Sequence, residues 1–156
     1  MLVYRIERQK YLKEVFTGRG ASLTLRNRWN SLQTPMVYTS ESRSLALLEV
    51  LAYVDLFNDL PSDRLLLEIS IPDHLLLQRI SLEELPSDWN IYPPNKTTQA
   101  LGDAFIQQSV FPILQVPSSL VKGEYNFLLH PRHSEIAAIQ LISTEQLNLN
   151  RWRKEI

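Results

Sequence analysis

The stretch Ser44-Leu-Ala-Leu-Leu-Glu-Val-Leu-Ala-Tyr-Val54 decides how the rest of the sequence is interpreted. Its apolar residues recur at helical spacing and on more than one face, which predicts a buried helix over about residues 42–57. Ser40 or Ser42 can cap this helix by accepting a backbone N–H. Glu49 is the only charged side chain in the stretch. Burying an unpaired carboxylate costs several kcal/mol, so Glu49 is expected to be paired, protonated or turned toward a polar cleft.

Around this helix the chain consists mainly of short segments rich in strand-forming residues. They predict strands at Leu2–Glu7, Ser22–Leu25, Met36–Thr39, Arg64–Ile71, Leu75–Ile80, Pro112–Val116, Tyr125–Leu129 and Ala137–Ile142. Ser81–Glu84 has the form of a capping box, and a second long helix is expected from Thr97 or Thr98 to about Gln108. Six or seven strands among these eight segments, together with two principal helices, predict an α+β (mixed α/β) fold around a central mixed sheet.

The length of 156 residues and the absence of any repeat or linker predict a single domain over 1–156, with a core over about 3–142 and a polar tail over 143–156. A net charge of −1 gives no overall field for a phosphate backbone, so direct nucleic-acid binding is not expected. No apolar run approaches the roughly 20 residues that a membrane helix needs. Without a secretion signal at the N-terminus, the sequence predicts a cytoplasmic protein.

Two residue counts restrict the chemistry. The sequence has no Cys, which removes thiol nucleophiles and cysteine-containing zinc sites. It has only four Gly, too few and too scattered for the glycine-rich loops that hold phosphates in P-loop and dinucleotide-binding folds. His130 and His133 resemble a metal pair, but a Pro lies between them and no second ligand cluster follows, so no metal site is expected.

Four side chains are candidates for chemistry, and each has an ordinary structural alternative. Glu49 faces either a cleft or a narrow solvent stripe. Arg28 lies beside Trp29 in a polar segment, where a guanidinium can bind a phosphate or carboxylate, although most such arginines are simply surface residues. A tyrosine in the position of Tyr38 is most often simply a strand residue in the core, with one hydrogen-bond partner for its hydroxyl. Ser118 follows a strand end but lacks the glycines of a nucleophile elbow, so it is not expected to be a nucleophile.

The order of the motifs is more informative than any one of them. The chain presents Val3-Tyr-Arg-Ile6, Gly20-Ala21, Arg28-Trp-Asn30, Pro35-Met-Val-Tyr-Thr-Ser-Glu-Ser42, Leu45-Ala-Leu-Leu-Glu-Val50, Thr98-Gln-Ala-Leu-Gly-Asp103, Val116-Pro-Ser118 and Glu124-Tyr-Asn126 in succession. In this it resembles the RES domain family, from about Val3 to Ile142. The Arg, Glu and Ser that give the family its name correspond to Arg28, Glu49 and Ser118.

This resemblance implies a fold like that of the ADP-ribosyltransferases and a role as the toxin of a bacterial toxin–antitoxin pair. Family members consume NAD by cleaving the bond between nicotinamide and ribose, and differ in passing ADP-ribose to water, phosphate or a protein. NAD is thus the implied substrate, with no metal. The implied partner is an Xre-type antitoxin that covers the active site, within a homodimer or larger assembly. A catalytically silent protein that only binds a partner is the alternative.

The resemblance also implies a role for each residue. Arg28, Tyr38, Glu49 and Ser118 form the expected catalytic set: Glu49 stabilises the developing ribose cation, Arg28 holds a phosphate or the ribose, and Tyr38 stacks on nicotinamide. Ser118 and Asn126 are expected to position the dinucleotide, with Tyr53 as a further binding residue. The chain departs from the family at Leu25-Arg-Asn27, where relatives commonly have glycines, and at His130, where many have Asn.

Overall fold

The computed structural model describes residues 1–53 and 62–148. Within them lies one seven-stranded mixed sheet with strand order β4-β5-β6-β2-β1-β3-β7. The β4–β5 pair is parallel, and every other neighbouring pair is antiparallel. The strands are β1 (Leu2–Arg8), β2 (Val37–Ser40), β3 (Arg64–Ser70), β4 (Leu77–Arg79), β5 (Ile113–Pro117), β6 (Tyr125–Leu129) and β7 (Gln140–Gln146). This confirms the predicted mixed α/β architecture.

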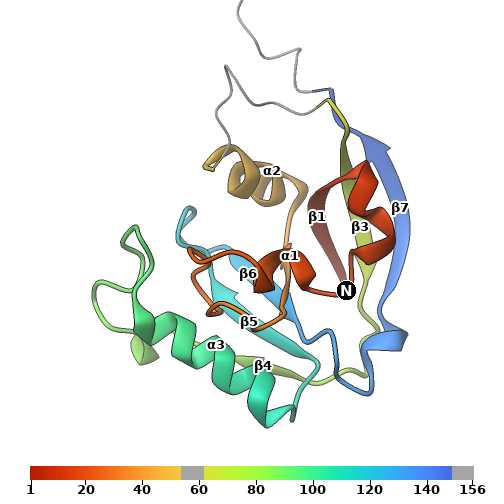
Figure 1. The fold of residues 1–156 in the computed structure, drawn as a ribbon. Helices are drawn as coiled ribbons and strands as arrows, with labels where there is room; N and C mark the ends of the chain where they lie inside the picture. The colour runs from red at the N-terminus through yellow and green to blue at the C-terminus, as the bar shows by residue number, and fades with distance from the viewer. Residues whose placement is uncertain (54–61, 149–156) are drawn as a thin grey trace, which may run out of the picture.

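The helices are short apart from two. These are α2 (Arg43–Leu51) and α3 (Lys96–Gln108), accompanied by α1 (Arg19–Ser22) and the 3₁₀ segments η1 (Gln9–Glu14), η2 (Leu82–Glu84) and η3 (Ile136–Ala138). In Figure 1, α2 lies near β1 on one side of the molecule, and α3 runs alongside β4 and β5 at the other end. The side chain of Ser42 caps α2 by accepting from the backbone N–H of Leu45 at 3.0 Å, as predicted. Asn95 caps α3, which begins at Lys96, one or two residues earlier than expected.

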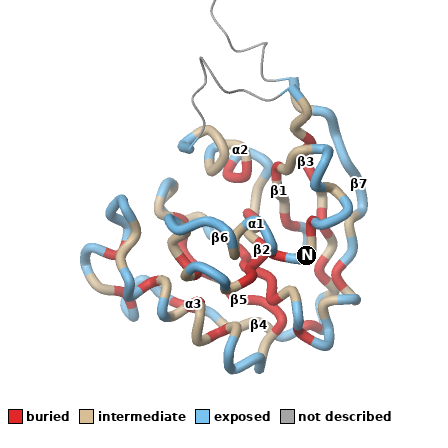
Figure 2. Tube along the Cα trace, in the orientation of Figure 1, coloured by how far each residue is buried: buried red, intermediate tan, exposed pale blue. Residues whose placement is uncertain are grey.

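Alternation along the strands places apolar side chains on both faces of the sheet. Leu65, Leu67 and Ile69 of β3 enter one core cluster, whereas Leu66 joins a smaller cluster beneath α2. Phe105 of α3 belongs to a further core cluster, through which this helix packs on the sheet. The buried residues therefore run through the middle of the molecule, as Figure 2 shows in red.

The helix predicted over 42–57 is shorter and less buried than expected. It ends at Leu51 and is followed by a turn, and residues 54–57 lie outside the described residues. Only Leu45 and Ala46 of α2 are buried, while Leu48 is 41% exposed. The apolar pattern covers more than one face, but the helix packs on the sheet through one face only. The other faces are left partly exposed.

One predicted strand is absent, and another is displaced along the chain. Ser22–Leu25 is not a strand, because α1 occupies Arg19–Ser22 and the backbone N–H of Leu23 bonds back to Gly20 at 3.3 Å. Leu23 and Leu25 are 69% and 70% exposed. The alternation of apolar and polar residues in this segment therefore does not correspond to a strand with one buried face. The last strand begins at Gln140 rather than Ala137 and runs to Gln146, four residues into the segment predicted as a polar tail. Its polar side chains suit an exposed edge strand.

The segment that leads into β2 is fixed by two close backbone approaches. Gly18 has φ of 66°, and a Cβ there would lie 2.5 Å from the backbone nitrogen of Met36. Gly102 of α3 touches the backbone of Trp29, where a Cβ would lie 1.6 Å from the carbonyl oxygen. Glycines thus let a loop and a helix pack directly on the chain that carries Arg28 and Tyr38.

Candidate active site

A pocket of about 520 Å³ opens where β1 and β2 separate. The register pairs these strands at Tyr4 and Ser40 alone, and the next residues of both strands line the pocket instead of continuing the ladder. Arg5 bridges the gap: its Nη1 donates to the carbonyl oxygen of Tyr38 at 2.8 Å, and its Nη2 bonds Glu7 at 2.6 Å. The volume lies within the range of small-molecule sites.

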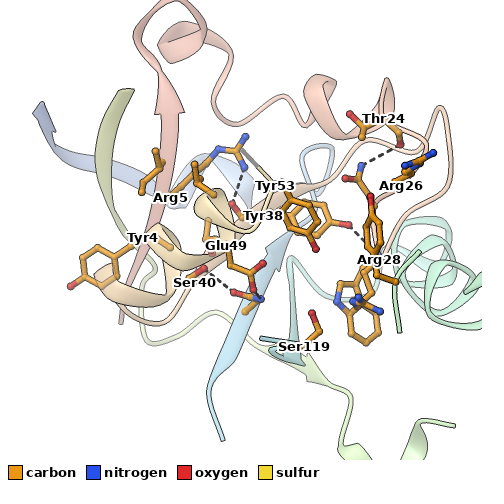
Figure 3. Close-up of a pocket in the computed structure, with 18 residues that line it drawn as sticks. Tyr4, Arg5, Thr24, Arg26, Arg28, Tyr38, Ser40, Glu49, Tyr53 and Ser119 are labelled. Atoms are coloured by element: carbon orange, nitrogen blue, oxygen red, sulfur yellow. Dashed lines mark hydrogen bonds between the residues drawn. The ribbon is translucent and has the colours of Figure 1, made fainter. Parts of the chain in front are cut away.

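Glu49 projects from α2 into this pocket and is held in place (Figure 3). Its Oε1 accepts a hydrogen bond from Asn126 Nδ2 at 2.7 Å and a longer one from Ser118 Oγ at 3.5 Å. Burial raises the pKa of Glu49, and the two hydrogen bonds and the charge of Arg28 oppose that rise. Within the described residues, Glu49 Oε2 has no hydrogen-bond partner. One oxygen is therefore anchored and the other is available to a ligand.

The residues behind Glu49 form a chain of hydrogen bonds across the sheet. Ser40 Oγ donates to Asn126 Oδ1 at 2.8 Å, which fixes the amide so that Nδ2 faces Glu49. Ser118 lies at the end of β5 and is 5% exposed. Its Oγ accepts from the backbone N–H groups of Leu120 and Val121, both at 3.1 Å. Because its lone pairs are occupied, the Ser118 hydroxyl is suited to donate to Glu49 and not to attack a substrate.

Arg28 enters the pocket from the opposite wall. Its Nη1 donates to the carbonyl oxygens of Trp89 and Ile91 at 2.6 and 3.1 Å, and its guanidinium lies 5.8 Å from the centre of the Trp89 ring. Both hydrogen-bond acceptors are neutral, so the positive charge is not compensated by a carboxylate at those contacts. The Nε and Nη2 groups retain their donor capacity for an anionic ligand.

Tyr38 of β2 lines the pocket, with its hydroxyl turned to the protein. The hydroxyl donates to Asn30 Oδ1 at 2.7 Å and accepts from the backbone N–H of Trp29 at 3.2 Å. Burial raises the pKa of Tyr38 far above its ordinary value. The phenol thus remains neutral and rigidly held, which leaves its ring rather than its hydroxyl to meet a ligand.

Five of the six residues selected from the sequence line the pocket: Arg28, Tyr38, Glu49, Tyr53 and Asn126. Ser118 lies just behind the wall, hydrogen-bonded to Glu49, and its neighbour Ser119 lines the pocket.

Sequence reasoning did not select several other lining residues. Arg5 and Ser40 belong to motifs quoted for the resemblance, but neither was selected as a residue of the site, and Ser40 was considered only as a possible helix cap. Tyr92 lies in a segment interpreted only as a loop, and no motif pointed to it. A side chain that reaches the pocket from such a segment is visible only once the tertiary structure is known.

The two histidines considered as a metal pair serve the turn after β6. His130 Nδ1 accepts from the backbone N–H of Arg132 at 3.1 Å, which leaves Nε2–H to donate to the carbonyl oxygen of Ile106 at 3.0 Å. Burial lowers the pKa of His130. Over residues 1–53 and 62–148 no group of three or more His, Asp or Glu side chains is arranged to hold a metal ion. No helix in the same ranges has the length and apolar character to cross a bilayer.

A family model described as the RES domain matches residues 2–150. The chain belongs to the RES domain family. Among curated RES relatives, "Toxin Res" of Photorhabdus laumondii subsp. laumondii is 38% identical over 131 residues, covering 84% of this chain and 82% of the relative. The "Prs ADP-ribosylating toxin" of a Sphingobium species is 32% identical over 132 residues, covering 83% of this chain and 81% of the relative.

A solved structure shares the fold. The crystal structure of the M. tuberculosis MbcT–MbcA toxin–antitoxin complex contains a chain that superposes with a TM-score of 0.75, covering 94% of this chain and 83% of that one, at 19% identity. The likeness extends over nearly the whole RES domain and confirms the predicted fold.

Proposed function

We propose that this protein is the toxin of a toxin–antitoxin pair and that it consumes NAD by cleaving the bond between nicotinamide and ribose. Family membership supports the class, and so do relatives named as toxins, one of them ADP-ribosylating. The observation that carries the proposal is the state of Glu49. Its carboxylate is largely buried at the wall of the pocket, anchored through one oxygen and available to a ligand through the other.

The chemistry of the bond matches such a carboxylate. When the ribose C1–nicotinamide N bond breaks, its electron pair leaves with nicotinamide, which becomes neutral, and positive charge develops on the ribose ring. A fixed carboxylate beside C1 stabilises that charge most in a site with little water. The acceptor then adds to C1 and its proton is released. Glu49 needs to be ionised for this role, and the hydrogen bonds from Asn126 and Ser118 favour that form.

The remaining residues bind and orient NAD. Arg28 is proposed to hold a phosphate or the ribose next to nicotinamide through the donors that do not contact Trp89 and Ile91, and its charge favours the ionised form of Glu49. The fixed ring of Tyr38 is proposed to contact nicotinamide. Asn126 and Ser118 act on NAD through Glu49, whose position they set. No metal is needed for any of these roles.

The test is release of nicotinamide from NAD by the purified protein, followed by chromatography. Glu49→Gln keeps both hydrogen-bond acceptor contacts but has no charge, so we expect release to fall by about 10²–10³-fold, the range typical of removing one preorganised transition-state interaction. Circular dichroism checks that the variant is folded. Turnover by Glu49→Gln near the wild-type rate would refute the mechanism. A wild-type protein that binds an antitoxin but releases no nicotinamide would favour a binding-only protein.

The acceptor and the partner belong to the same proposal. Mass analysis of the products, with and without inorganic phosphate, separates ADP-ribose, its 1-phosphate and an ADP-ribosylated protein. We propose an Xre-type antitoxin as partner, with the toxin in a homodimer or larger assembly. Co-expression and light scattering of the purified complex test both statements, and a monomeric toxin that binds no such partner would contradict them.

A further inference from the structure

An aromatic wall stands at the mouth of the pocket, formed by Tyr53 and Tyr92. Their ring centres lie 6.2 Å apart with planes tilted by 46°, and both residues line the pocket. Each is 57% exposed. Two large rings in contact with each other yet open to solvent over a pocket are free to contact a ligand as well.

The wall is held by the same guanidinium that faces Glu49. Arg28 donates to the carbonyl oxygens of Trp89 and Ile91, which lie three residues and one residue before Tyr92, and so fixes the segment that carries this ring. Trp89 anchors the segment from below: it is 8% exposed, and its ring lies 6.1 Å from that of Trp29. The exposed segment that carries the Tyr92 ring is therefore held to the protein by Arg28 and by the buried side chain of Trp89.

The wall also stands next to the reacting group. Tyr53 follows Glu49 by four residues and lies in the turn directly after α2, where its backbone N–H bonds the carbonyl oxygen of Val50 at 3.1 Å. The negative charge of Glu49 helps burial to raise the pKa of Tyr53, whereas the charge of Arg28 opposes the rise. Tyr53 lines the pocket together with Glu49 and Arg28, so its ring borders the same cavity as the carboxylate.

We infer that the aromatic wall of Tyr53 and Tyr92 binds the cationic nicotinamide ring of NAD before cleavage. This rests on the proposed function, because Glu49 acts at ribose C1 and nicotinamide is the base bonded to that atom. The adenine ring is separated from C1 by a diphosphate and a second ribose. The nicotinamide ring of NAD is flat and positively charged, and tyrosine faces attract such rings, whereas the released nicotinamide is neutral and loses this attraction.

The wall can be tested without turnover by two small probes, 1-methylnicotinamide, which is cationic, and nicotinamide, which is neutral. Binding to the wild-type protein is followed by ligand-observed NMR or calorimetry. We expect 1-methylnicotinamide to bind about 2–10-fold more tightly than nicotinamide, in line with a modest cation–π contribution. Equal affinities for the two probes would overturn the inference.

Three variants assign the preference to the wall. Tyr92→Leu keeps apolar bulk but removes the aromatic face, and we expect it to abolish the preference for 1-methylnicotinamide. Tyr92→Phe keeps the face and should retain the preference. Tyr11→Leu, which changes an exposed tyrosine outside the pocket, should behave as wild type. Loss of the preference in Tyr92→Phe, or its survival in Tyr92→Leu, would refute a role for the Tyr92 ring.

The result can be separated from the proposed function. If NAD is cleaved, Tyr92→Leu should raise KM for NAD by about 3–10-fold and change kcat less than twofold, since the ring leaves the reacting bond untouched. AMP, which carries only the adenine half, should inhibit wild type and Tyr92→Leu equally; weaker AMP inhibition in the variant would overturn the assignment in favour of adenine. If NAD is not cleaved, the probe experiment still decides whether the wall binds a cationic ring.

Discussion

At the residue scale, the two oxygens of Glu49 have different surroundings. Oε1 is anchored by Asn126 and Ser118, while Oε2 has no partner within the described part of the chain. The native protein accordingly holds a carboxylate that is costly to keep ionised but fixed in direction. Such a group lowers stability at neutral pH and is available for catalysis.

The stability cost of Glu49 gives a prediction with a defined sign. Its pKa is raised in the folded protein, so the native state binds the proton more tightly than the unfolded chain. Its contribution to stability is therefore present near pH 4 and lost as pH rises through the raised pKa. Glu49→Gln should unfold at a higher temperature than wild type at pH 7, by an amount that shrinks toward pH 4.

Thermal unfolding followed by calorimetry across this pH range measures the effect. Glu83→Gln, which neutralises an exposed carboxylate in η2, is the matched control and should show no such pH-dependent gain. A Glu49→Gln protein that is less stable than wild type at pH 7 would contradict the assigned burial cost.

Asn126 sets the charge state of Glu49 and so predicts a shift in pH dependence. Asn126→Asp replaces the amide donor at 2.7 Å by a second carboxylate, which removes a hydrogen bond to Glu49 and adds like-charge repulsion. The acidic limb of the pH–rate profile for nicotinamide release should move to higher pH, with activity at pH 7 reduced by about tenfold or more. A profile that keeps its acidic limb would show that Asn126 does not control Glu49.

At the element scale, the packing of α3 on the chain before β2 positions the segment that carries Arg28. Gly102→Ala would place a methyl group 1.6 Å from the carbonyl oxygen of Trp29, so the helix or the loop must move. We expect a loss of at least about 1–3 kcal/mol of stability, typical of overpacking. Gly20→Ala, in α1, meets no atom within 4 Å and serves as the control. Equal unfolding temperatures for the two variants would contradict this packing.

Sequence reasoning was most successful where one pattern had one structural meaning. The strand over Tyr125–Leu129 and the capping box at Ser81 have such patterns, and both are present. It failed at Ser22–Leu25, where an alternating pattern of four residues carries exposed leucines, because burial depends on what packs against a segment and no local pattern records this.

For the candidate site, the identity of most residues could be predicted from the sequence, whereas their orientation could not. Glu49 stood out because a charge inside an apolar helix is chemically costly, and Arg28, Tyr38 and Ser118 followed from the order of motifs. The direction of each side chain did not follow. That Ser118 faces Glu49, and that Tyr92 completes the mouth, depend on chain segments 69 and 39 residues from Glu49 and Tyr53 respectively.

At the scale of the whole molecule, the pocket is lined by residues of β1, β2 and β6 and by α2. A ligand in it contacts several elements at once and should therefore stabilise the entire fold. Anything that binds only the native state adds RT ln(1 + [L]/Kd), about 2.7 kcal/mol at 100 times Kd. For a domain of this size that corresponds to roughly 5–10 °C in unfolding temperature. Glu49→Gln, which should bind NAD without cleaving it, should show this rise with increasing NAD in thermal scans. No rise up to millimolar NAD would contradict NAD binding in the pocket.

The hydrogen bond between Asn126 and Glu49 spans 77 residues of sequence, and this has a consequence for the newly made protein. A ribosome adds about 5–20 residues per second, so the partner that orients the carboxylate is synthesised roughly 4–15 s after the carboxylate itself. A growing chain therefore passes through an interval in which Glu49 exists without its anchor. The proposed cleavage of NAD therefore requires β6 to take its place in the sheet first, which predicts a short delay between synthesis of Glu49 and the onset of that activity.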